Sequence, residues 1–343
     1  MPLLIDGTAI PPRWAEKTSS RQRPARVASN GDSPANAVKI AFINNMPDSA
    51  LEDTEVQFLE LLESAADTIP VQVKLLSLPG VPRGDRGQQH LNNFYSGSDG
   101  LGDCRFDALI MTGTEPRSRN LRDEPYWSAL GDVLDWAERN TVSTVLSCLA
   151  AHAAVLHSDG IPRNPLSEKQ FGVFGYTRAG EHPLTTGAPR VIRNPHSRWN
   201  EVQEDALVSC GYDVLTRSDD EGVDLFVKKK KNSLFVSFQG HPEYGVQTLL
   251  KEYRRDIRRF VKGERETYPA APQDYFDVAS TKLLADFQDR VLSAPSEELM
   301  ATFPEAALGS TLENSWRSSA TCLYRNWLQY VASNRVEQPL ARH

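Results

Sequence analysis

The sequence predicts an α/β protein built on a doubly wound, mostly parallel sheet with helices on both faces. Over residues 38–147, short apolar runs rich in β-branched residues alternate with runs whose apolar residues recur at helical spacing. This order is typical of parallel strands joined by right-handed crossovers. The last of these strands ends at a cysteine, and an alanine-rich helical run follows at once. Such a turn is typical of a nucleophile at the edge of a sheet.

The composition limits the classes of protein to consider. The chain has 343 residues, 40% of them hydrophobic, so it can bury a large core, and we expect a single domain over residues 37–335. The net charge of -7 gives no electrostatic reason to expect nucleic acid or a membrane as a partner. The 4 cysteines lack the spacing of a zinc site, and no run approaches membrane-spanning length. We therefore expect a soluble cytoplasmic protein with no bound metal or cofactor.

The first half of the chain supplies most of the predicted parallel sheet. Strands are predicted over residues 38–43, 71–78, 106–113 and 142–147, and helices over residues 51–66 and 126–140. Residues 80–102 interrupt this alternation with a segment rich in Gly, Arg and Ser. That segment is long enough to be functional rather than a simple connection.

The second half is less regular. A further strand is predicted over residues 168–176, and residues 194–199 are expected to form a polar loop. The apolar runs at 224–227 and 233–238 flank the lysine-rich residues 228–232, which predicts a β-hairpin. We interpret the lysines as a solvated hairpin tip, with phosphate binding as the alternative.

The two ends of the chain are expected to lie outside the sheet. Residues 13–36 are rich in Arg, Ser, Pro, Ala and Asn, which favours a mobile or surface-hugging arm over residues 1–36. A charged helix is predicted from residue 246 to about residue 262, followed by helical patterns from residue 276 and over residues 316–331. We expect this helical C-terminal extension to pack on the sheet or against a second copy. Residues 336–343 are expected to form a tail.

Cys148 is the first candidate for chemistry. A thiol between a strand and a helix faces backbone N–H groups and the positive end of the helix dipole, and both favour the nucleophilic thiolate. The alternative is a buried free cysteine that packs as a small hydrophobe. For a nucleophile here, the backbone N–H groups of Leu149 and of Gly113 or Thr114 are our candidates for an oxyanion hole.

The tripeptide His241-Pro-Glu243 is the second chemical signal. A histidine after a strand can take the proton of a thiol and later return one, while a carboxylate two positions on fixes its tautomer. Alone, the tripeptide is equally compatible with a structural loop. Together with a cysteine at a strand end, it predicts a catalytic set of Cys148, His241 and Glu243. His152 is a rival partner one helical turn beyond Cys148, and we expect it to pack instead.

Several longer motifs resemble one family. The elbow cysteine, Gly240-His-Pro-Glu-Tyr244 and residues 90–95, 195–198 and 315–317 together resemble the homoserine O-acyltransferases, or homoserine transsuccinylases. The resemblance covers roughly residues 38–330. It implies a class I glutamine amidotransferase-like (flavodoxin-like) fold and, since the family forms dimers, a homodimer.

The resemblance also implies a reaction. Cys148 would take the acyl group of an acyl-CoA co-substrate as a thioester, with His241 as general base and Glu243 orienting it. The hydroxyl of L-homoserine would then attack that thioester, in a ping-pong cycle that belongs to methionine biosynthesis. Succinyl-CoA is slightly favoured over acetyl-CoA. The substrate-binding residues implied by the resemblance are Lys169, Ser197, Arg198, Glu252 and Arg255, the last for the amino acid carboxylate.

Departures from the family leave donor and acceptor open. Residues 45–55 lack the paired lysines that the family has after Met-Pro, and Leu149 replaces an aromatic residue. Arg117 stands where succinyl users have a small residue and acetyl users a glutamate. Its guanidinium would complement a succinyl carboxylate, or turn to a CoA phosphate or to solvent. L-serine or another hydroxy amino acid is the alternative acceptor.

Two other function classes stay open. A glutaminase or amidotransferase would use the same cysteine, histidine and glutamate on glutamine. It would usually show glycines on both sides of its cysteine, where this chain has Ser147 and Leu149. A non-catalytic binding protein on the same fold is the third class.

Overall fold

A ten-stranded sheet forms the centre of the computed structural model, which describes residues 3–21, 25–28, 34, 36–102 and 104–335. The strand order is β10-β13-β14-β7-β6-β3-β4-β1-β2, with β5 beside β4. All neighbouring strands pair in parallel except at β13, which is antiparallel to β14 and β10. The prediction of a mostly parallel sheet is therefore confirmed. Its strands are β1 (Leu4–Asp6), β2 (Arg26–Val27), β3 (Val38–Ile43), β4 (Val71–Ser77), β5 (Ser96–Gly97), β6 (Ala108–Met111), β7 (Ser143–Ser147), β10 (Asp213–Val214), β13 (Leu225–Lys230) and β14 (Ser233–Phe238).

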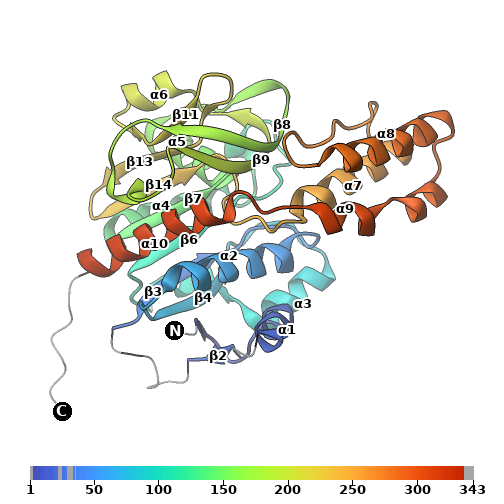
Figure 1. Cartoon of the computed structure of the whole chain (residues 1–343). Helices are drawn as coiled ribbons and strands as arrows, with labels where there is room; N and C mark the ends of the chain where they lie inside the picture. The colour runs from blue at the N-terminus through green and yellow to red at the C-terminus, as the bar shows by residue number, and fades with distance from the viewer. Residues whose placement is uncertain (1–2, 22–24, 29–33, 35, 103, 336–343) are drawn as a thin grey trace, which may run out of the picture.

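Helices cover both faces of this sheet, as a doubly wound fold requires. On the face toward the viewer in Figure 1, α2 (Leu51–Ala66) and α10 (Arg317–Asn334) bury their apolar sides in one hydrophobic cluster with the strands. On the opposite face, α4 (Trp127–Asn140) and α5 (Leu149–Asp159) belong to a second cluster. The remaining helices of the α/β body are α1 (Pro12–Ser20), α3 (Asp85–Phe94) and α6 (Glu204–Ser209).

A smaller antiparallel sheet lies beside the main one. It contains β12 (Gly222–Val223), β11 (Thr216–Ser218), β8 (Asn164–Arg178) and β9 (Val191–Glu201), in that order. The expectation of a polar loop over residues 194–199 is wrong, because these residues lie within β9. The side chains of Asn194, His196 and Arg198 point to one face of the strand and are buried. A buried strand face made of polar side chains has no apolar alternation, so the usual strand signal is missing.

The predicted β-hairpin is confirmed as β13 and β14. The lysine-rich segment is only partly a tip, because Lys228 and Lys230 lie within β13 and both contact the carboxylate of Asp159, at 2.6 Å and 3.0 Å. The chain turns at Lys231, which has a φ of 45°. The lysines therefore fasten the end of α5 to the hairpin.

The N-terminal residues differ from a mobile arm. In the described part of residues 1–36, β1 pairs with β4 and β2 pairs with β1, so both extend the main sheet. Between them, α1 buries Trp14 in the core shared with α2. The polar composition of this segment concealed the buried apolar side chains of Leu3, Ile5 and Trp14. The predicted tail over residues 336–343 lies outside the described residues.

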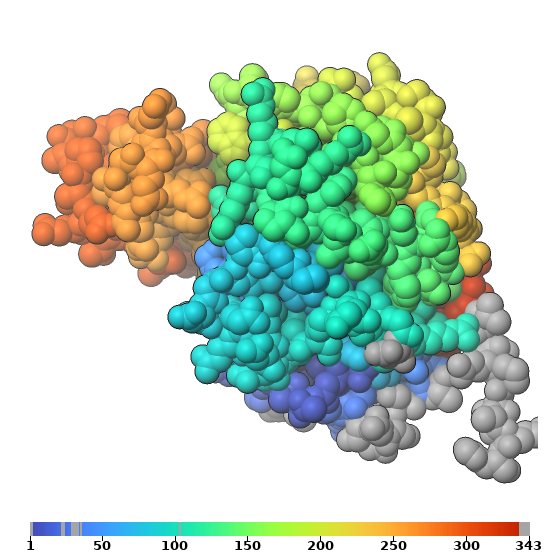
Figure 2. Space-filling view, turned by 180° about the vertical axis from the view of Figure 1, so that it is seen from behind, coloured from blue at the N-terminus to red at the C-terminus, as the bar shows by residue number. Residues whose placement is uncertain are grey.

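The C-terminal helices divide between the sheet and a separate group. Helix α10 packs on the sheet as expected. Helices α7 (Thr248–Val261), α8 (Val278–Ser293) and α9 (Glu305–Thr311) enclose a third apolar cluster together with Trp316. Figures 1 and 2 show this group projecting from one side of the α/β body. Among the helices of the described residues, none is long and apolar enough to cross a membrane. The homodimer stays a prediction.

Trp327 gives a test of the packing of α10 on the sheet. Its indole is buried in the first cluster, and its Nε1 donates a hydrogen bond to Ser143 Oγ at 2.9 Å. We expect Trp327→Ala to lower the free energy of unfolding by about 3–5 kcal/mol, because it leaves a large cavity. Urea denaturation followed by circular dichroism measures this loss. Val278→Ala, at a residue that is 90% exposed, is the control and should change stability by less than about 0.5 kcal/mol. Equal stability of both variants would contradict the packing described.

Candidate active site

Cys148 occupies a strained turn between β7 and α5. Its backbone has φ 53° and ψ -113°, a conformation that residues other than glycine rarely adopt. The strand before it is fully buried, and its N–H donates to the carbonyl of Phe238 at 2.8 Å, so the turn is held by the sheet itself. The side chain is partly exposed at the carboxyl edge of the sheet. This is the geometry of a nucleophile elbow.

Strand β14 brings His241 to the same edge. It runs parallel to β7 with Phe238 opposite Ser147, so the residues that follow the two strands emerge together. A Cβ on Gly240 would lie 2.5 Å from Asn194 Nδ2 and 2.6 Å from His196 Nε2, so a larger residue there would have to displace these two buried side chains. The His241 N–H donates to the carbonyl of Pro195 at 2.8 Å. Strand β9 thus fixes the backbone of the histidine.

His241 and Glu243 form a buried pair next to the thiol. His241 Nδ1 lies 2.8 Å from Glu243 Oε1, which also accepts a hydrogen bond from Ser147 Oγ at 3.2 Å. Burial opposes the charged imidazole, but the charges of Cys148 and Glu243 and hydrogen bonds to both outweigh it and raise the pKa of His241 well above its ordinary value. The three predicted catalytic side chains are therefore brought together, and the arrangement favours an imidazolium beside the Cys148 sulfur.

His152 is separate from this set. It is buried on α5, and its Nε2 lies 2.8 Å from Gln239 Oε1. Burial lowers the pKa of His152 to about 3, so it stays a neutral packing group. This agrees with the role expected from the sequence.

The proposed oxyanion donors lie against the elbow. A Cβ on Gly113 would come within 2.7 Å of Leu149 Cβ and 2.9 Å of Leu149 N, so only glycine lets the chain after β6 approach this closely. Within the described residues, the N–H of Leu149 donates no hydrogen bond to another protein group, as expected for the first residue of a helix. Gly113, Thr114 and Leu149 all line the same cavity as Cys148.

That cavity has a volume of about 420 Å³. Its walls come from the loop after β3, the loop after β6, the elbow, strands β8 and β9, and helix α7. Its lining includes Thr114, Cys148, Arg163, Lys169, Ser197 and Arg255. Met46 and Pro47, which belong to residues 45–55, also line the cavity.

One end of the cavity is a cluster of paired charges. On α7, Glu252, Arg255 and Asp256 share one helix face. Lys169 Nζ lies 3.0 Å from Asp256 Oδ2, and Arg255 Nη2 lies 3.2 Å from Asp256 Oδ1. Ser197 Oγ donates to Glu252 Oε2. Burial disfavours the charge on Arg255, but Glu252 and Asp256 raise the pKa of its guanidinium, so it stays a cation.

Local structure explains how Lys169 reaches this cluster. The pairing of β8 with β9 shifts register between Pro165 and Gln170, and Lys169 lies in that irregularity. Bulges of this kind commonly redirect a side chain next to a site. The ammonium also lies 3.9 Å from the centre of the Phe171 ring. Asp256 was missed by the sequence reasoning, although its position four residues after Glu252 was an available signal.

Tyr244 connects the catalytic pair with this cluster. Its ring stacks on His241 with the centroids 4.2 Å apart, and its hydroxyl donates to Glu252 Oε1 at 2.7 Å. Trp316 Nε1 donates to the Tyr244 carbonyl at 2.9 Å, which gives the C-terminal Ser-Trp-Arg motif a structural role. The sequence showed the motif but not this contact.

Two predicted site residues are placed differently from the others. Arg198 lines the cavity but is buried. Its guanidinium donates hydrogen bonds to His196 Nδ1 and to the carbonyls of Asn200 and Glu221. The Arg117 side chain is exposed and does not line the cavity, although its backbone N–H is held by Glu124. Arg163, which the sequence reasoning did not single out, does line it.

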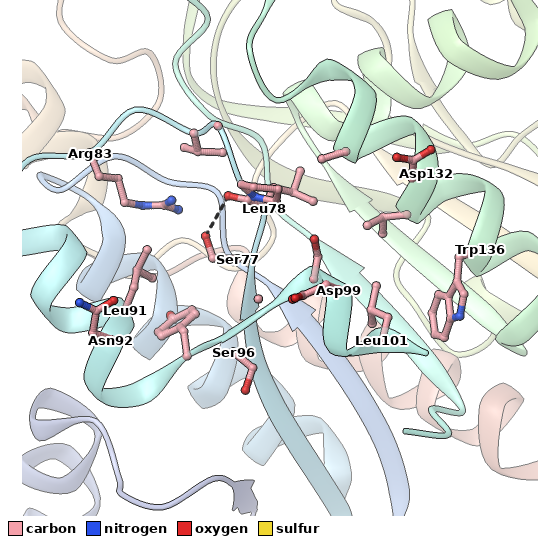
Figure 3. Close-up of a pocket in the computed structure, with 18 of the residues that line it drawn as sticks. Ser77, Leu78, Arg83, Leu91, Asn92, Ser96, Asp99, Leu101, Asp132 and Trp136 are labelled. Carbon is pink, nitrogen blue, oxygen red and sulfur yellow. Dashed lines mark hydrogen bonds between the residues drawn. The ribbon is translucent and has the colours of Figure 1, made fainter. Parts of the chain in front are cut away.

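A larger cavity of about 700 Å³ lies beyond the carboxyl end of β4, between α3 and α4 (Figure 3). Asp99 and Asp132 line it, and Arg83 lies at its far end. Its described lining residues include neither cysteine nor histidine. It therefore lacks the thiol and the imidazole that the cavity at Cys148 brings together. No cluster of three or more His, Cys, Asp and Glu side chains that could hold a metal ion occurs in the described ranges.

The fold and the site define an α/β enzyme with a Cys, His and Glu constellation at the edge of a parallel sheet. A family model described as "HTS: Homoserine O-succinyltransferase" matches residues 25–338. A homoserine O-succinyltransferase of Methylorubrum extorquens is 46% identical over 87% of this chain and 88% of its own length. One of Rhodopseudomonas palustris is 42% identical over 90% of this chain and 94% of its own length. The chain belongs to the homoserine O-succinyltransferase family.

A glutamine amidotransferase from Methylobacillus flagellatus matches with a TM-score of 0.49 and 14% identity, covering 90% of this chain and 98% of that one. A glutamine amidotransferase from Thermotoga maritima matches with a TM-score of 0.44 and 10% identity, covering 86% and 98%.

The raised pKa of His241 can be tested with Glu243→Gln. The imidazolium contributes stability below the ordinary histidine pKa, and this contribution is lost as the pH rises through the raised value. Removing the Glu243 carboxylate should lower the pKa of His241, so the loss moves to lower pH. Histidine ring titration by NMR measures it, and His152, with a pKa of about 3, should remain neutral in both proteins. An unchanged pKa of His241 in the variant would contradict the electrostatic role of Glu243.

Proposed function

We propose that this chain transfers a succinyl group from succinyl-CoA to the side-chain hydroxyl of L-homoserine through a thioester on Cys148. The observation that carries the proposal is the strained Cys148 elbow beside the His241 and Glu243 pair, in a cavity whose other end holds Arg255. The family supports the donor and the acceptor, because its members are named homoserine O-succinyltransferases.

In the first half of the cycle, the Cys148 thiolate attacks the thioester carbonyl of succinyl-CoA. A new carbon–sulfur bond forms, and the oxyanion meets the N–H groups of Leu149 and of Gly113 or Thr114. The bond to the CoA sulfur then breaks, and the imidazolium of His241 gives its proton to the leaving thiolate. His241 is left neutral, with Glu243 holding its Nδ1 side.

In the second half, the homoserine hydroxyl attacks the acyl carbon on Cys148. Neutral His241 takes the hydroxyl proton as the new carbon–oxygen bond forms. The bond to Cys148 breaks, which regenerates the thiolate beside the imidazolium and releases O-succinylhomoserine. Each half therefore begins in the protonation state that the other half leaves.

The acceptor is held by the charged cluster. Arg255 is suited to the amino acid carboxylate, since a planar guanidinium can donate two parallel hydrogen bonds. Glu252 lies beside it, with its Oε2 3.7 Å from Arg255 Nη2, and is suited to the ammonium group. Lys169 offsets the acidic charge of Asp256 and Glu252. L-serine is one methylene shorter than homoserine, so its hydroxyl would reach less far toward Cys148.

Mass spectrometry tests the nucleophile and the donor together. After mixing with succinyl-CoA and no acceptor, Cys148 should gain the mass of one succinyl group, and homoserine should remove it. Cys148→Ala should gain nothing, while His241→Gln should slow acylation by about 100- to 10,000-fold because the acid and base are lost. Serine and glutamine serve as competing substrates. Release of glutamate from glutamine without any acyl adduct would identify a glutaminase instead.

Adjacent arginines test the acceptor site. Arg255 faces the cavity, whereas the neighbouring Arg254 pairs with Glu305 on α9. We expect Arg255→Gln to raise KM for homoserine by about 10- to 100-fold, as for a lost charged hydrogen bond. Arg254→Gln is the matched control and should leave that KM unchanged. Steady-state kinetics at saturating succinyl-CoA measures both, and equal KM values would remove Arg255 from the site.

A further inference from the structure

The cations around the cavity differ in whether a carboxylate already neutralises them. Lys169 and Arg255 share Asp256, and Arg259 lies 3.5 Å from Glu115. Within the described part of the chain, Arg198 and Arg265 have no carboxylate partner, but protein acceptors occupy the guanidinium of Arg198, and Arg265 Nε donates to the carbonyl of Thr267 at 2.7 Å. These cations are therefore either paired with a carboxylate or hydrogen-bonded to protein acceptors.

Arg163 is different. It lies between α5 and β8, and its Nη2 makes one long contact of 3.4 Å with the carbonyl of Arg119. Among the described residues, no carboxylate lies within ion-pair distance of it. Glu124 acts on it from farther away, and Glu124 Oε1 already accepts the N–H groups of Arg117 and Ser118.

The surroundings of Arg163 place it on the acyl side of the cavity. Its side chain lines the cavity together with Gly113, Thr114 and Cys148, and burial lowers the pKa of its guanidinium. The amino acid cluster is built from α7, β8 and β9, whereas Arg163 comes from the segment between α5 and β8 and contacts the carbonyl of Arg119. A partly buried cation without a counter-ion is unfavourable, because it has lost hydration without gaining a partner. An anionic ligand would supply that partner.

We propose that Arg163 binds the free carboxylate of the succinyl group while that group is attached to Cys148. This inference rests on the proposed function. A succinyl thioester carries its carboxylate two methylene groups beyond the carbonyl carbon, so with the carbonyl oxygen at the Leu149 N–H the chain can extend toward the guanidinium. An acetyl group ends at its methyl and leaves Arg163 without a partner. Arg163 is thus a specificity-determining residue for dicarboxylic acyl donors.

Arg117 is the competing residue for this role. The sequence placed it at the acyl pocket, yet its neighbours Glu115 and Pro116 line the cavity and its own side chain is exposed. A guanidinium in solvent gains little from a carboxylate, because water already satisfies both groups. The partly buried Arg163 gains more from the same bidentate contact.

Acyl donors of matched shape test the proposal. Butyryl-CoA replaces the succinyl carboxylate with a methyl group, and acetyl-CoA removes that end of the chain. For Arg163→Gln we expect kcat/KM with succinyl-CoA to fall by about 10- to 100-fold, while butyryl-CoA and acetyl-CoA keep their values. Arg163→Lys, which keeps the charge without the planar fork, should fall less. Arg119→Gln, at an exposed neighbour, is the matched control and should change no donor.

The mass of the Cys148 adduct distinguishes a failure of the proposed function from a failure of this inference. If wild-type protein forms no adduct with any donor, the proposed function fails and this inference with it. If wild-type protein forms the succinyl adduct and Arg163→Gln keeps the same preference for succinyl over butyryl, only the inference is overturned. Equal losses for all three donors in both Arg163 variants would assign Arg163 a structural role. A succinyl-specific loss in Arg117→Gln alone would transfer the role to Arg117.

Discussion

The parallel pairing of β7 with β14 is the constraint on which the site depends. Ser147 and Phe238 lie opposite each other, and the Cys148 N–H closes the ladder on the Phe238 carbonyl. Beyond that bond both chains leave the sheet at the same edge, one as the strained elbow and the other as the segment that carries His241. A change of register by one residue would reverse the faces of a buried strand and separate the thiol from its base. The core therefore fixes the catalytic geometry.

A buried polar layer from the smaller sheet supports this edge. Asp224 accepts hydrogen bonds from the Gly240 N–H at 2.9 Å and from Asn194 Nδ2 at 2.8 Å. Burial raises the pKa of Asp224 to about 6, although these hydrogen bonds and the charges of Arg198 and His241 oppose the shift. Buried polar groups are costly unless they are paired, so this layer specifies one position for the Gly240 backbone. The polar face of β9 therefore helps to hold the backbone that leads to His241.

The sequence predicts the elements that local apolar patterns determine, and it does not predict those that depend on contacts between distant segments. The strand at 38–43 and the helix at 51–66 have the predicted bounds, because apolar periodicity alone determines them. Cys148 and His241 were also predictable, since Cys148 directly follows one apolar strand and His241 lies three residues after the end of another. Strand β9 was not predictable, because its buried face is polar. The contacts of that face with Asp224 and Gly240 are seen only in the folded structure. Arg163 carried no signal either, because its position depends on the reversal of the chain after α5.

The stacked ring of Tyr244 makes acceptor recognition and proton transfer parts of one rigid unit. Burial and the nearby Glu252 carboxylate raise the pKa of the Tyr244 hydroxyl well above its ordinary value, so it remains a donor. Its hydrogen bond occupies Glu252 Oε1, which leaves the Oε2 side, where Ser197 lies, for the ammonium group of the proposed acceptor. The same ring lies flat on the imidazole of His241. In the function proposed above, an acceptor bound at Glu252 would therefore be positioned relative to the base through the side chain of Tyr244.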